Sequence, residues 1–464
     1  MFLCFVKFAF GYRPRGFISL LLISFCSVSL AAEYDVGVGK KYSDPTDVPW
    51  ESLEPGDCVN VHWREQPYKS KWVICRRGTE QKPIVVRGIA KDGKLPVIDG
   101  ENAVPRKALD YWGDQRSIIK IGGAKKPADV MPAHIVIENL EIRGAHPRFT
   151  AKGTKGVVKY ASNAAPIWIE KGEHITIRNC TLTDSGNGFF VSQQSKDILL
   201  EGCSVFGNGI EGSIFEHNIY TEAAGMIFQN DHLGPFREKA RGNNLKDRSA
   251  GLVVRYNWID GGNRQLDLVD AQGSAEIRDD PRYRKTFVYG NVLIERDNDG
   301  NKQMVHYGGD SNKSAWFRKG TLYFYNNTVI SKRSDNTMLF RLSSNEEHVE
   351  CRNNIIYSLG KGVSMTLVST TGTLELGNNW FKTGAVLKRK NLREIGRSLF
   401  GNFPGFVDEA KQDYRLAPNS PCIKASVPNQ NIPIEQTPKR QYVRHQSSKA
   451  RPATQDLGAF ESGG

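Results

Sequence analysis

The stretch HIVIENLEI at residues 134–142 decides the fold, because close variants of it return along the chain. The variants are HITIRNCTL at 174–182, DILLEGCSV at 197–205, LVVRYNWI at 252–259, TFVYGNVLI at 286–294, TLYFYNNTVI at 321–330, HVECRNNII at 348–356 and TLELGNNW at 373–380. Each alternates apolar and polar residues, turns at Asn or Gly, and resumes with a second apolar pair. This pattern predicts a strand, a tight bend and a second strand. No copy can bury its apolar side alone, so the copies must stack as the coils of a parallel β-solenoid.

An antiparallel sandwich is the alternative, since it also has many short strands between turns. The Asn residues argue against it, because hairpins give no reason for Asn to recur at one register of the motif. A stacked coil does: Asn tolerates the left-handed conformation of the bend, and its amide can bond the same amide one coil away. The residues concerned are Asn139, Asn179, Asn257, Asn291, Asn327, Asn354 and Asn379.

The first 31 residues are typical of a signal peptide. Lys7, Arg13 and Arg15 form a charged start, an apolar run follows at 17–23, and Ser29-Leu30-Ala31 supplies small residues for cleavage. An uncleaved anchor is the alternative. We therefore expect a secreted or periplasmic protein with no membrane association after signal removal.

The remaining chain divides by its patterns into three regions. We expect an N-terminal cap and first coils at 32–133, the β-helix core at 134–381, and C-terminal coils with a tail at 382–464. Large gaps separate copies of the motif at 144–173, 209–250, 261–284 and 297–318, and such insertions often build the binding surface of a solenoid. The tail is expected to cap the open end, with 439–451 as an exposed basic loop.

Cysteines and charge add further expectations. In an exported protein, Cys58 and Cys75 are the plausible disulfide, whereas Cys180 and Cys203 share a register and are expected as stacked free thiols. The formal net charge of +13 suggests an acidic partner. Acidic polysaccharide fits best, because no nucleic-acid motif is present; a solvated basic surface is the alternative. We expect a monomer.

Reactive side chains are densest between Glu216 and Asp270. Consecutive coils place equivalent residues about 4.8 Å apart, so Lys246 is expected to meet Asp267 and Asp270 on one surface. The catalytic candidates are Lys246, Arg248, His217, Tyr220, Asp267 and Asp270, and the substrate-binding candidates are Arg255, Arg264, Asn244 and His232. A lysine acts as a base only if burial or nearby cations lower its pKa, and Arg248 and Arg255 are candidates for that role. The structural alternatives are surface ion pairs for Lys246 and Arg248, a hydrogen-bonded histidine at 217, and a turn residue at Asp270.

The segments PIVVRG at 83–88, DYRLAPNSP at 413–421 and DLGAFE at 456–461, together with the strand motif, resemble the right-handed parallel β-helix, pectate-lyase-like superfamily of carbohydrate-active proteins. Within it, NNLKDRSAGLVVRYNWI at 243–259 is similar to the active coil of the alginate lyase and chondroitinase B family. That resemblance implies a right-handed β-helix in which Lys246 abstracts the C5 proton of a uronate.

Two departures from that family are visible. Its Arg-His pair on the next coil is replaced by LDLVDAQ at 266–272, and the acidic residue expected before the lysine for calcium-assisted neutralisation is replaced by Ala240, Arg241 and Gly242. No metal ligand is therefore predicted, and calcium stays an open alternative.

Three functions follow from these patterns. The leading one is a polysaccharide lyase that cleaves a uronate-containing chain by β-elimination, with an arginine neutralising the carboxylate, Lys246 as base, and Tyr220 or His217 as proton donor. The second is a glycoside hydrolase using paired carboxylates, Asp267 with Asp270 or Asp231. The third is a non-catalytic glycan-binding protein whose aromatics stack on sugars, although core packing is the alternative role for them. These aromatics are Trp258, Tyr289, Tyr307, Trp316 and Tyr323.

Overall fold

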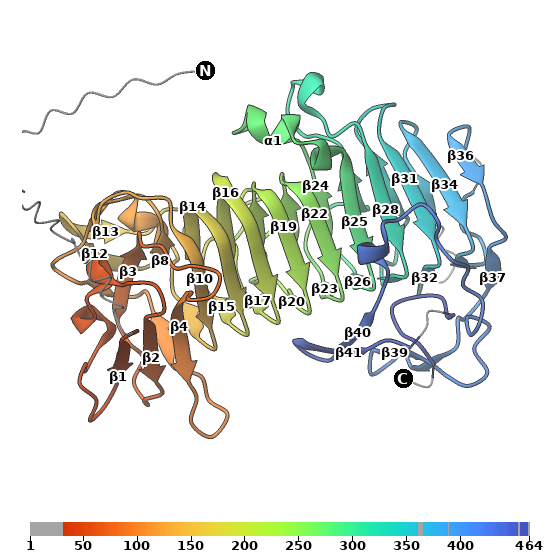
Figure 1. Ribbon diagram of the computed structural model, residues 1–464. Coiled ribbons are helices and arrows are strands. Elements are labelled where there is room, and N and C mark those ends of the chain that lie inside the picture. The colour runs from red at the N-terminus through yellow and green to blue at the C-terminus, as the bar shows by residue number, and fades with distance from the viewer. Residues whose placement is uncertain (1–30, 361–364, 388, 453–454, 463–464) are drawn as a thin grey trace, which may run out of the picture.

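The chain winds into stacked coils that form three sheet faces, and the strands within each face run parallel to one another. In the middle of the stack, each coil contributes one strand to each face. A computed structural model describes residues 31–360, 365–387, 389–452 and 455–462. The predicted signal peptide falls almost wholly outside this range. In Figure 1 the coils progress from β1 at one end to β36 and β37 at the other. No helix among the described residues is long and apolar enough to cross a membrane.

The first face contains the leading strand of each repeated motif. Its strands are β1 (Glu33–Val36), β2 (Cys58–His62), β4 (Ile84–Ile89), β10 (Ala133–Glu138), the later parts of β14 (Ala165–Arg178) and β16 (Phe189–Glu201), β19 (Ala224–Gln229), β22 (Ala250–Arg255), β25 (Lys285–Tyr289), β28 (Thr321–Tyr325), β31 (His348–Arg352), β34 (Thr373–Gly377) and β36 (Leu392–Glu394). All pair in parallel with their neighbours.

The second face comes from the gaps between motifs, which the sequence pattern assigns to insertions. Its strands are β3 (Ser70–Ile74), β8 (Ser117–Ile121), the early parts of β14 and β16, β18 (Ile219–Thr221), β21 (Leu245–Asp247), β24 (Leu266–Leu268), β27 (Gln303–Tyr307), β30 (Thr337–Leu342) and β33 (Met365–Val368). The gaps therefore contain a regular part of every middle coil.

The third face contains the second strand of each motif, after the bend. Its strands are β5 (Val97–Asp99), β11 (Glu141–Arg143), β15 (Thr181–Thr183), β17 (Ser204–Phe206), β20 (His232–Leu233), β23 (Trp258–Asp260), β26 (Val292–Glu295), β29 (Thr328–Ser331), β32 (Ile355–Ser358), β35 (Trp380–Lys382) and β37 (Leu399–Gly401). The predicted strand, bend and strand are thus confirmed. The parallel solenoid is confirmed against the antiparallel sandwich.

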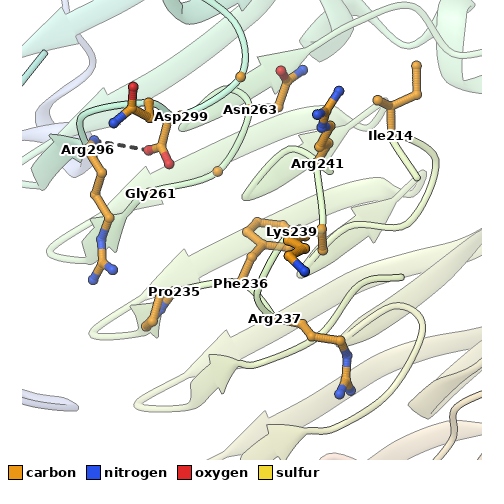
Figure 2. A pocket seen from close by; sticks show the side chains of 14 residues that line it. Ile214, Pro235, Phe236, Arg237, Lys239, Arg241, Gly261, Asn263, Arg296 and Asp299 are labelled. Carbon is orange, nitrogen blue, oxygen red and sulfur yellow. Dashed lines mark hydrogen bonds between the residues drawn. The ribbon is translucent and has the colours of Figure 1, made fainter. Parts of the chain in front are cut away.

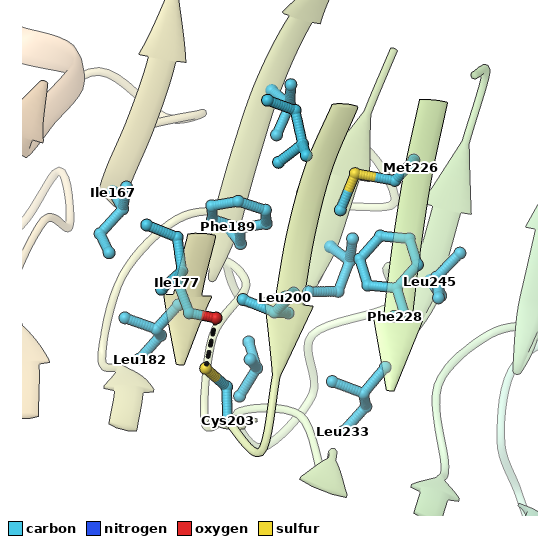
Figure 3. Close-up of a cluster of buried hydrophobic side chains, with 14 of the residues drawn as sticks. Ile167, Ile177, Leu182, Phe189, Leu200, Cys203, Met226, Phe228, Leu233 and Leu245 are labelled. Carbon is cyan, nitrogen blue, oxygen red and sulfur yellow. Dashed lines mark hydrogen bonds between the residues drawn. The ribbon is translucent and has the colours of Figure 1, made fainter. Parts of the chain in front are cut away.

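The core lies between the three faces and consists of stacked apolar rows. Ile177, Leu200 and Phe228 occupy equivalent positions of successive strands, and Leu182 and Leu233 belong to the opposite row. Figure 3 shows these side chains converging from different coils. Each fully buried side chain of this size stabilises the fold by about 1.5–3 kcal/mol, so the stack is held mainly by contacts between neighbouring coils.

The predicted Asn ladder is confirmed, but the single register was wrong. Asn139 and Asn179 have φ of 57° and 52° and form the bend itself. The other five lie one position later, where their amides are fully buried. Each Nδ2 donates to Oδ1 of the next coil, over 3.0, 3.0, 3.1 and 3.0 Å along Asn257, Asn291, Asn327, Asn354 and Asn379. A left-handed residue such as Gly290 precedes each member and takes over the bend.

An aspartate continues this ladder toward the N-terminus. The Asp231 N–H donates to Asn257 Oδ1 over 2.8 Å, and Asp231 Oδ1 accepts from the Cys203 N–H over 2.8 Å. Burial holds the pKa of Asp231 well above its ordinary value. An aspartate whose burial favours the neutral carboxyl therefore occupies an amide position of the ladder.

The cysteine expectations had mixed outcomes. Cys180 and Cys203 are buried free thiols on adjacent coils, as predicted. Cys58 and Cys75 are also free, so the predicted disulfide was wrong. They belong to different faces: Cys58 begins β2 on the first face, whereas Cys75 follows β3 on the second.

The tail folds back along the solenoid. The hairpin of β40 (Arg440–Val443) and β41 (Ser447–Ala450) lies against the flank of the middle coils (Figure 1). Arg444 lies over the Trp258 ring at 5.2 Å, and Gln446 Nε2 donates to the Gly202 carbonyl over 3.2 Å. The expectation of an exposed loop at 439–451 was therefore wrong, because this segment is a hairpin that contacts the flank. Arg451 at its end is buried and its Nε donates to Glu461.

Candidate functional site

Four residues on consecutive coils of the second face share one row. Tyr220, Lys246, Asp267 and His306 are direct partners in the pairing of β18, β21, β24 and β27. Their neighbours in sequence alternate into the core, because side chains of a strand point to opposite faces. The row therefore presents polar groups on the outside of the solenoid, with about 4.8 Å between coils.

Lys246 is bound by two carboxylates. Its Nζ donates to Asp267 Oδ2 over 2.9 Å and to Asp310 Oδ2 over 2.5 Å. The side chain is 11% exposed. Burial alone would lower the pKa of Lys246, but the two carboxylates outweigh it and the pKa is raised. The predicted condition for a lysine base was therefore wrong, and Lys246 stays an ammonium in this state.

Arg248 binds the same aspartate as Lys246. Its Nη1 and Nη2 donate to the two oxygens of Asp310 over 3.0 and 3.1 Å, and its Nε donates to Tyr220 Oη over 3.0 Å. Gln272 Nε2 also donates to Asp310 over 3.0 Å. Four side-chain donors thus converge on one carboxylate. Burial would raise the pKa of Asp310, but Lys246 and Arg248 lower it to about 2.

Asp310 was missed by the sequence analysis. It lies in the loop that follows β27, more than 60 residues from both of its cationic partners. No local motif distinguishes it, because the sequence GGD at 308–310 is typical of an ordinary turn. It is the most solvent-accessible carboxylate of the cluster, with 27% of its side chain exposed against 2% for Asp267.

Asp270 positions the loop that carries Asp310. Its Oδ1 accepts from the backbone N–H groups of Asp310 and Ser311 over 2.7 and 3.3 Å. It is fully buried. A role as a positioning residue therefore fits Asp270 better than a catalytic one.

Asp267 is the buried centre of the row. Its Oδ1 bonds His306 Nδ1 over 2.8 Å, and its Oδ2 accepts from Asn243 Nδ2 over 2.7 Å. Arg264 Nη1 approaches it at 3.5 Å. Burial would raise the pKa of Asp267, but Lys246, His306 and Arg264 lower it well below its ordinary range. Asp267 is thus a fixed anion that orients its partners, and Arg264 does lie in the predicted cluster.

His217 lies beside Tyr220, with ring centroids 5.7 Å apart. Its Nδ1 accepts from the Asn243 N–H over 3.0 Å, so the proton of the neutral ring is on Nε2. Burial, followed by Lys246, lowers the pKa of His217 to about 3. The imidazole is therefore neutral at physiological pH.

Three predicted substrate-binding residues are not brought to this row. Arg255 ends β22 on the first face and bonds Gln229 and Tyr289. His232 lies on the third face, stacked at 4.0 Å on His445 of the tail. Asn244 is fully buried, and its Nδ2 donates to the carbonyls of residues 233, 260 and 261. Their placement corrects the prediction, because each is engaged in holding the fold.

The structure also places the aspartate predicted for a hydrolase pair and the aromatics predicted to stack on sugars. Asp231 lies in the buried ladder, at the bend between β19 and β20, and not in the row of Lys246. Trp258, Tyr289 and Tyr307 are at most 2% exposed and pack in the core. Trp316 and Tyr323 are half-buried.

Metal-ligating atoms gather elsewhere among the described residues. His348, Glu350 and Glu375 have ligand atoms within 4.8 Å of one another on the first face. Glu350 already bonds Asn431 and Arg352, and Glu375 lies 3.5 Å from His348. Around Lys246, by contrast, both carboxylates are neutralised by side-chain cations, so that cluster does not offer a calcium site.

Comparison with known proteins supports the fold. The family model described as right handed beta helix region matches residues 119–280. The chain is a right-handed parallel β-helix protein. The matched region contains Lys246 and Asp267 but ends before His306 and Asp310. No curated protein matches the sequence.

Solved structures with a similar course of the chain are distant. The pectate lyase Pel9A is 12% identical, with 93% of this chain and 97% of that chain covered and a TM-score of 0.49. An alginate lyase from Paenibacillus sp. str. FPU-7 is 12% identical, with 71% and 94% covered and a TM-score of 0.42. A lacto-N-biosidase from Eubacterium ramulus is 12% identical, with 80% and 68% covered and a TM-score of 0.48. Their activities differ, so they assign none to this chain.

Proposed function

We propose that this protein is a carbohydrate-active enzyme that cleaves a uronate-containing polysaccharide by β-elimination. One observation carries the proposal: Lys246, Arg248 and Gln272 aim four donors at a single carboxylate, that of Asp310. This donor set matches a carboxylate in geometry and charge. We propose that the uronate carboxylate of the substrate takes the place of Asp310.

The chemistry of elimination explains why such a receptor is needed. The C5 proton of a uronate becomes acidic only when its carboxylate is neutralised, and fixed positive charge stabilises the enolate-like intermediate. Lys246 and Arg248 supply that charge, which replaces the base role first expected for Lys246. Asp267 keeps Lys246 protonated and in position.

Tyr220 is the proposed proton carrier. Its Oη accepts a hydrogen bond from Arg248 Nε over 3.0 Å, which fixes the phenol oxygen beside the donors that hold the carboxylate, and in the proposed step it reacts as the phenolate. The phenolate takes the C5 proton, the C4–O bond breaks as the C4–C5 double bond forms, and the phenol then returns the proton to the leaving oxygen. His217 is the second proposed proton donor to the leaving oxygen. Its Nε2 carries the proton of the neutral ring, and this ring lies beside that of Tyr220.

A hydrolase on the same face is less well supported. Hydrolysis by two carboxylates requires one that stays protonated as the acid. The pKa values of both Asp267 and Asp310 are lowered. The pair that meets at Lys246 therefore lacks the acid.

Export and an acidic substrate belong to the same proposal. A signal peptide at 1–31 would place the protein in the periplasm or outside the cell, where polysaccharide is found. The formal net charge of +13 favours encounter with a polyanion.

The test is ultraviolet absorbance of the new double bond. Purified protein is incubated with alginate, pectate, glucuronan and glycosaminoglycans, with and without calcium. We expect a rise with one of them, at least 100-fold slower in Tyr220→Phe and Arg248→Gln. Arg255→Gln is the matched control, because it removes a hydrogen-bonded arginine outside the row, and it should stay within about twofold. New reducing ends without absorbance would replace elimination by hydrolysis.

A further inference from the structure

A cleft of about 660 Å³ opens beside the row, at the N-terminal ends of β21 and β24. Its walls come from four separate loops, around residues 214, 235–241, 261–263 and 296–300. Figure 2 shows these loops and the side chains that line the cleft. The volume lies within the range of sites that bind small ligands.

Hydrogen bonds join the cleft to the proposed reaction centre. Asn263 lines the cleft, and its Nδ2 donates to Asn243 Oδ1 over 3.2 Å. Asn243 Nδ2 in turn donates to Asp267 Oδ2 over 2.7 Å, the same oxygen that Lys246 binds. Lys246 follows Asn243 by three residues, roughly 10 Å along an extended chain. A polymer that places one unit at Lys246 could therefore place another in the cleft.

One cation of the cleft is unpaired. Four cationic residues line it, and three are engaged by carboxylates: Arg237 by Asp184, Lys239 by Glu211 and Arg296 by Asp260. Arg241 is exposed, and among the described residues its guanidinium has no side-chain or backbone acceptor. It lies beside Asn263, whose N–H donates to the carbonyl of Gly242 over 2.8 Å. The cleft thus offers one free guanidinium next to an amide.

The remaining lining suits a sugar ring. Phe236 and Ile214 provide apolar surface, and Ile214 is 54% exposed. The only carboxyl in the lining is Asp299, whose pKa burial raises to about 7. Its repulsion of a bound anion is therefore reduced below neutral pH. Apolar surface with a few placed polar groups is typical of carbohydrate and cofactor sites.

We propose that this cleft is a subsite for a second acidic sugar unit of the same polysaccharide, whose carboxylate binds Arg241 and whose ring lies on Phe236. The proposal rests on the proposed function, because it assumes that the chain cleaved at Lys246 continues into the cleft. It predicts a substrate with acidic units on both sides of the cleaved bond or in near succession.

Binding is tested in the Tyr220→Phe background, so that the ligand is not consumed. Calorimetric titration compares trigalacturonate, trimannuronate and triglucuronate with neutral maltotriose and a sulfated chondroitin oligosaccharide. We expect Arg241→Gln to weaken binding of one uronate trisaccharide about 10-fold and to leave maltotriose unchanged. Lys285→Gln is the matched control, since it removes an exposed cation that begins β25 on the first face, outside the cleft.

Several results would overturn the subsite. These are equal losses in both variants, no loss in Arg241→Gln, no uronate binding by the parent, or dependence on Arg241 only for the sulfated ligand. The subsite and the reaction fail separately. Elimination with an unchanged KM in Arg241→Gln would remove the subsite alone, whereas Arg241-dependent binding without any double bond would remove the reaction alone.

Discussion

The substitution Asp310→Asn removes the charge that Lys246 and Arg248 hold while preserving the shape of the side chain. The pKa of Asp310 falls from 3.8 to about 2 in the folded protein. One pKa unit corresponds to 1.36 kcal/mol, so the ionised form gains about 2 kcal/mol from its neighbours. Because the folded pKa is depressed, this stability is fully present above pH 3.8 and is lost as the pH falls through 2.

Hydrogen exchange measured by mass spectrometry reports this energy locally. The amides of Asp310 and Ser311 bond Asp270, so peptides covering 308–313 record the opening of the loop. At pH 7 we expect Asp310→Asn to speed their exchange about 30-fold, the equivalent of 2 kcal/mol. Peptides from the third face should exchange as in the parent protein.

Asp335→Asn is the matched control. The pKa of Asp335 is also lowered to about 2, by Arg333 and Lys302, but its side chain is 44% exposed, against 27% for Asp310. Water screens such pairs, so exchange around residue 335 should change little. Exchange at 308–313 within twofold of the parent, or equal changes at both sites, would refute the reasoning that burial makes the Asp310 contacts strong.

The same substitution separates two roles for Asp310. If its carboxylate holds the place of the substrate, Asn competes less well for Lys246 and Arg248, and KM for the uronate polymer should fall. If Asp310 is instead a catalytic carboxylate, kcat should collapse. Steady-state kinetics on the polymer identified by absorbance distinguishes a KM effect from a kcat effect.

Three further predictions concern groups away from Asp310. Asp231→Asn should raise the free energy of unfolding by about 1 kcal/mol at pH 7. The gain should grow from pH 4 upward, because folding favours the protonated carboxyl in the parent protein. Guanidinium unfolding across pH 4–8 checks this, and a loss of stability in the variant would contradict a neutral carboxyl at 231. Asn327→Leu should destabilise by about 2–4 kcal/mol, since the ladder amides on both sides lose a buried partner, whereas Asn402→Leu at an exposed position should be neutral in the same assay. Lowering the pH from 6.5 toward 3 should destabilise the parent protein more than His217→Gln. The reason is that the unfolded state takes up a proton, whereas the buried imidazole, with its pKa of about 3, does not. Parallel pH profiles of the free energy of unfolding would contradict this.

The sequence predicted two of the three faces, for a physical reason. Strands such as those at 134–142 alternate over five or six residues and end at a left-handed Asn, so the periodicity is visible. The strands of the second face in the site are only three residues long, Leu245–Asp247 and Leu266–Leu268, and their outward positions carry charge. Three residues give too short a pattern to distinguish a strand from a loop.

The candidate site was predicted in part on the same basis. Equal spacing along coils brings Lys246 and Asp267 together, because the register of a parallel stack is local in sequence. His306 and Asp310 lie on the next coil, beyond a long loop, where spacing alone does not fix the register. The misplaced Arg255, His232 and Asn244 share one cause: each is close to Lys246 in sequence but belongs to another face or to the core. Residues that are close in sequence along one coil can lie on different faces of the solenoid.

The returning tail changes how this stack can come apart. In a simple array of coils, each unit touches only its neighbours, and unravelling starts at whichever end is weaker. Here Gln446 reaches Gly202, 244 residues earlier, and Tyr325 and Asn326 bond the backbone of residues 436 and 456. The last coils therefore cannot peel away one by one without first detaching a strap that spans the middle of the molecule. Proteolytic removal of 425–462 should convert one cooperative melting transition into a gradual, end-first fraying.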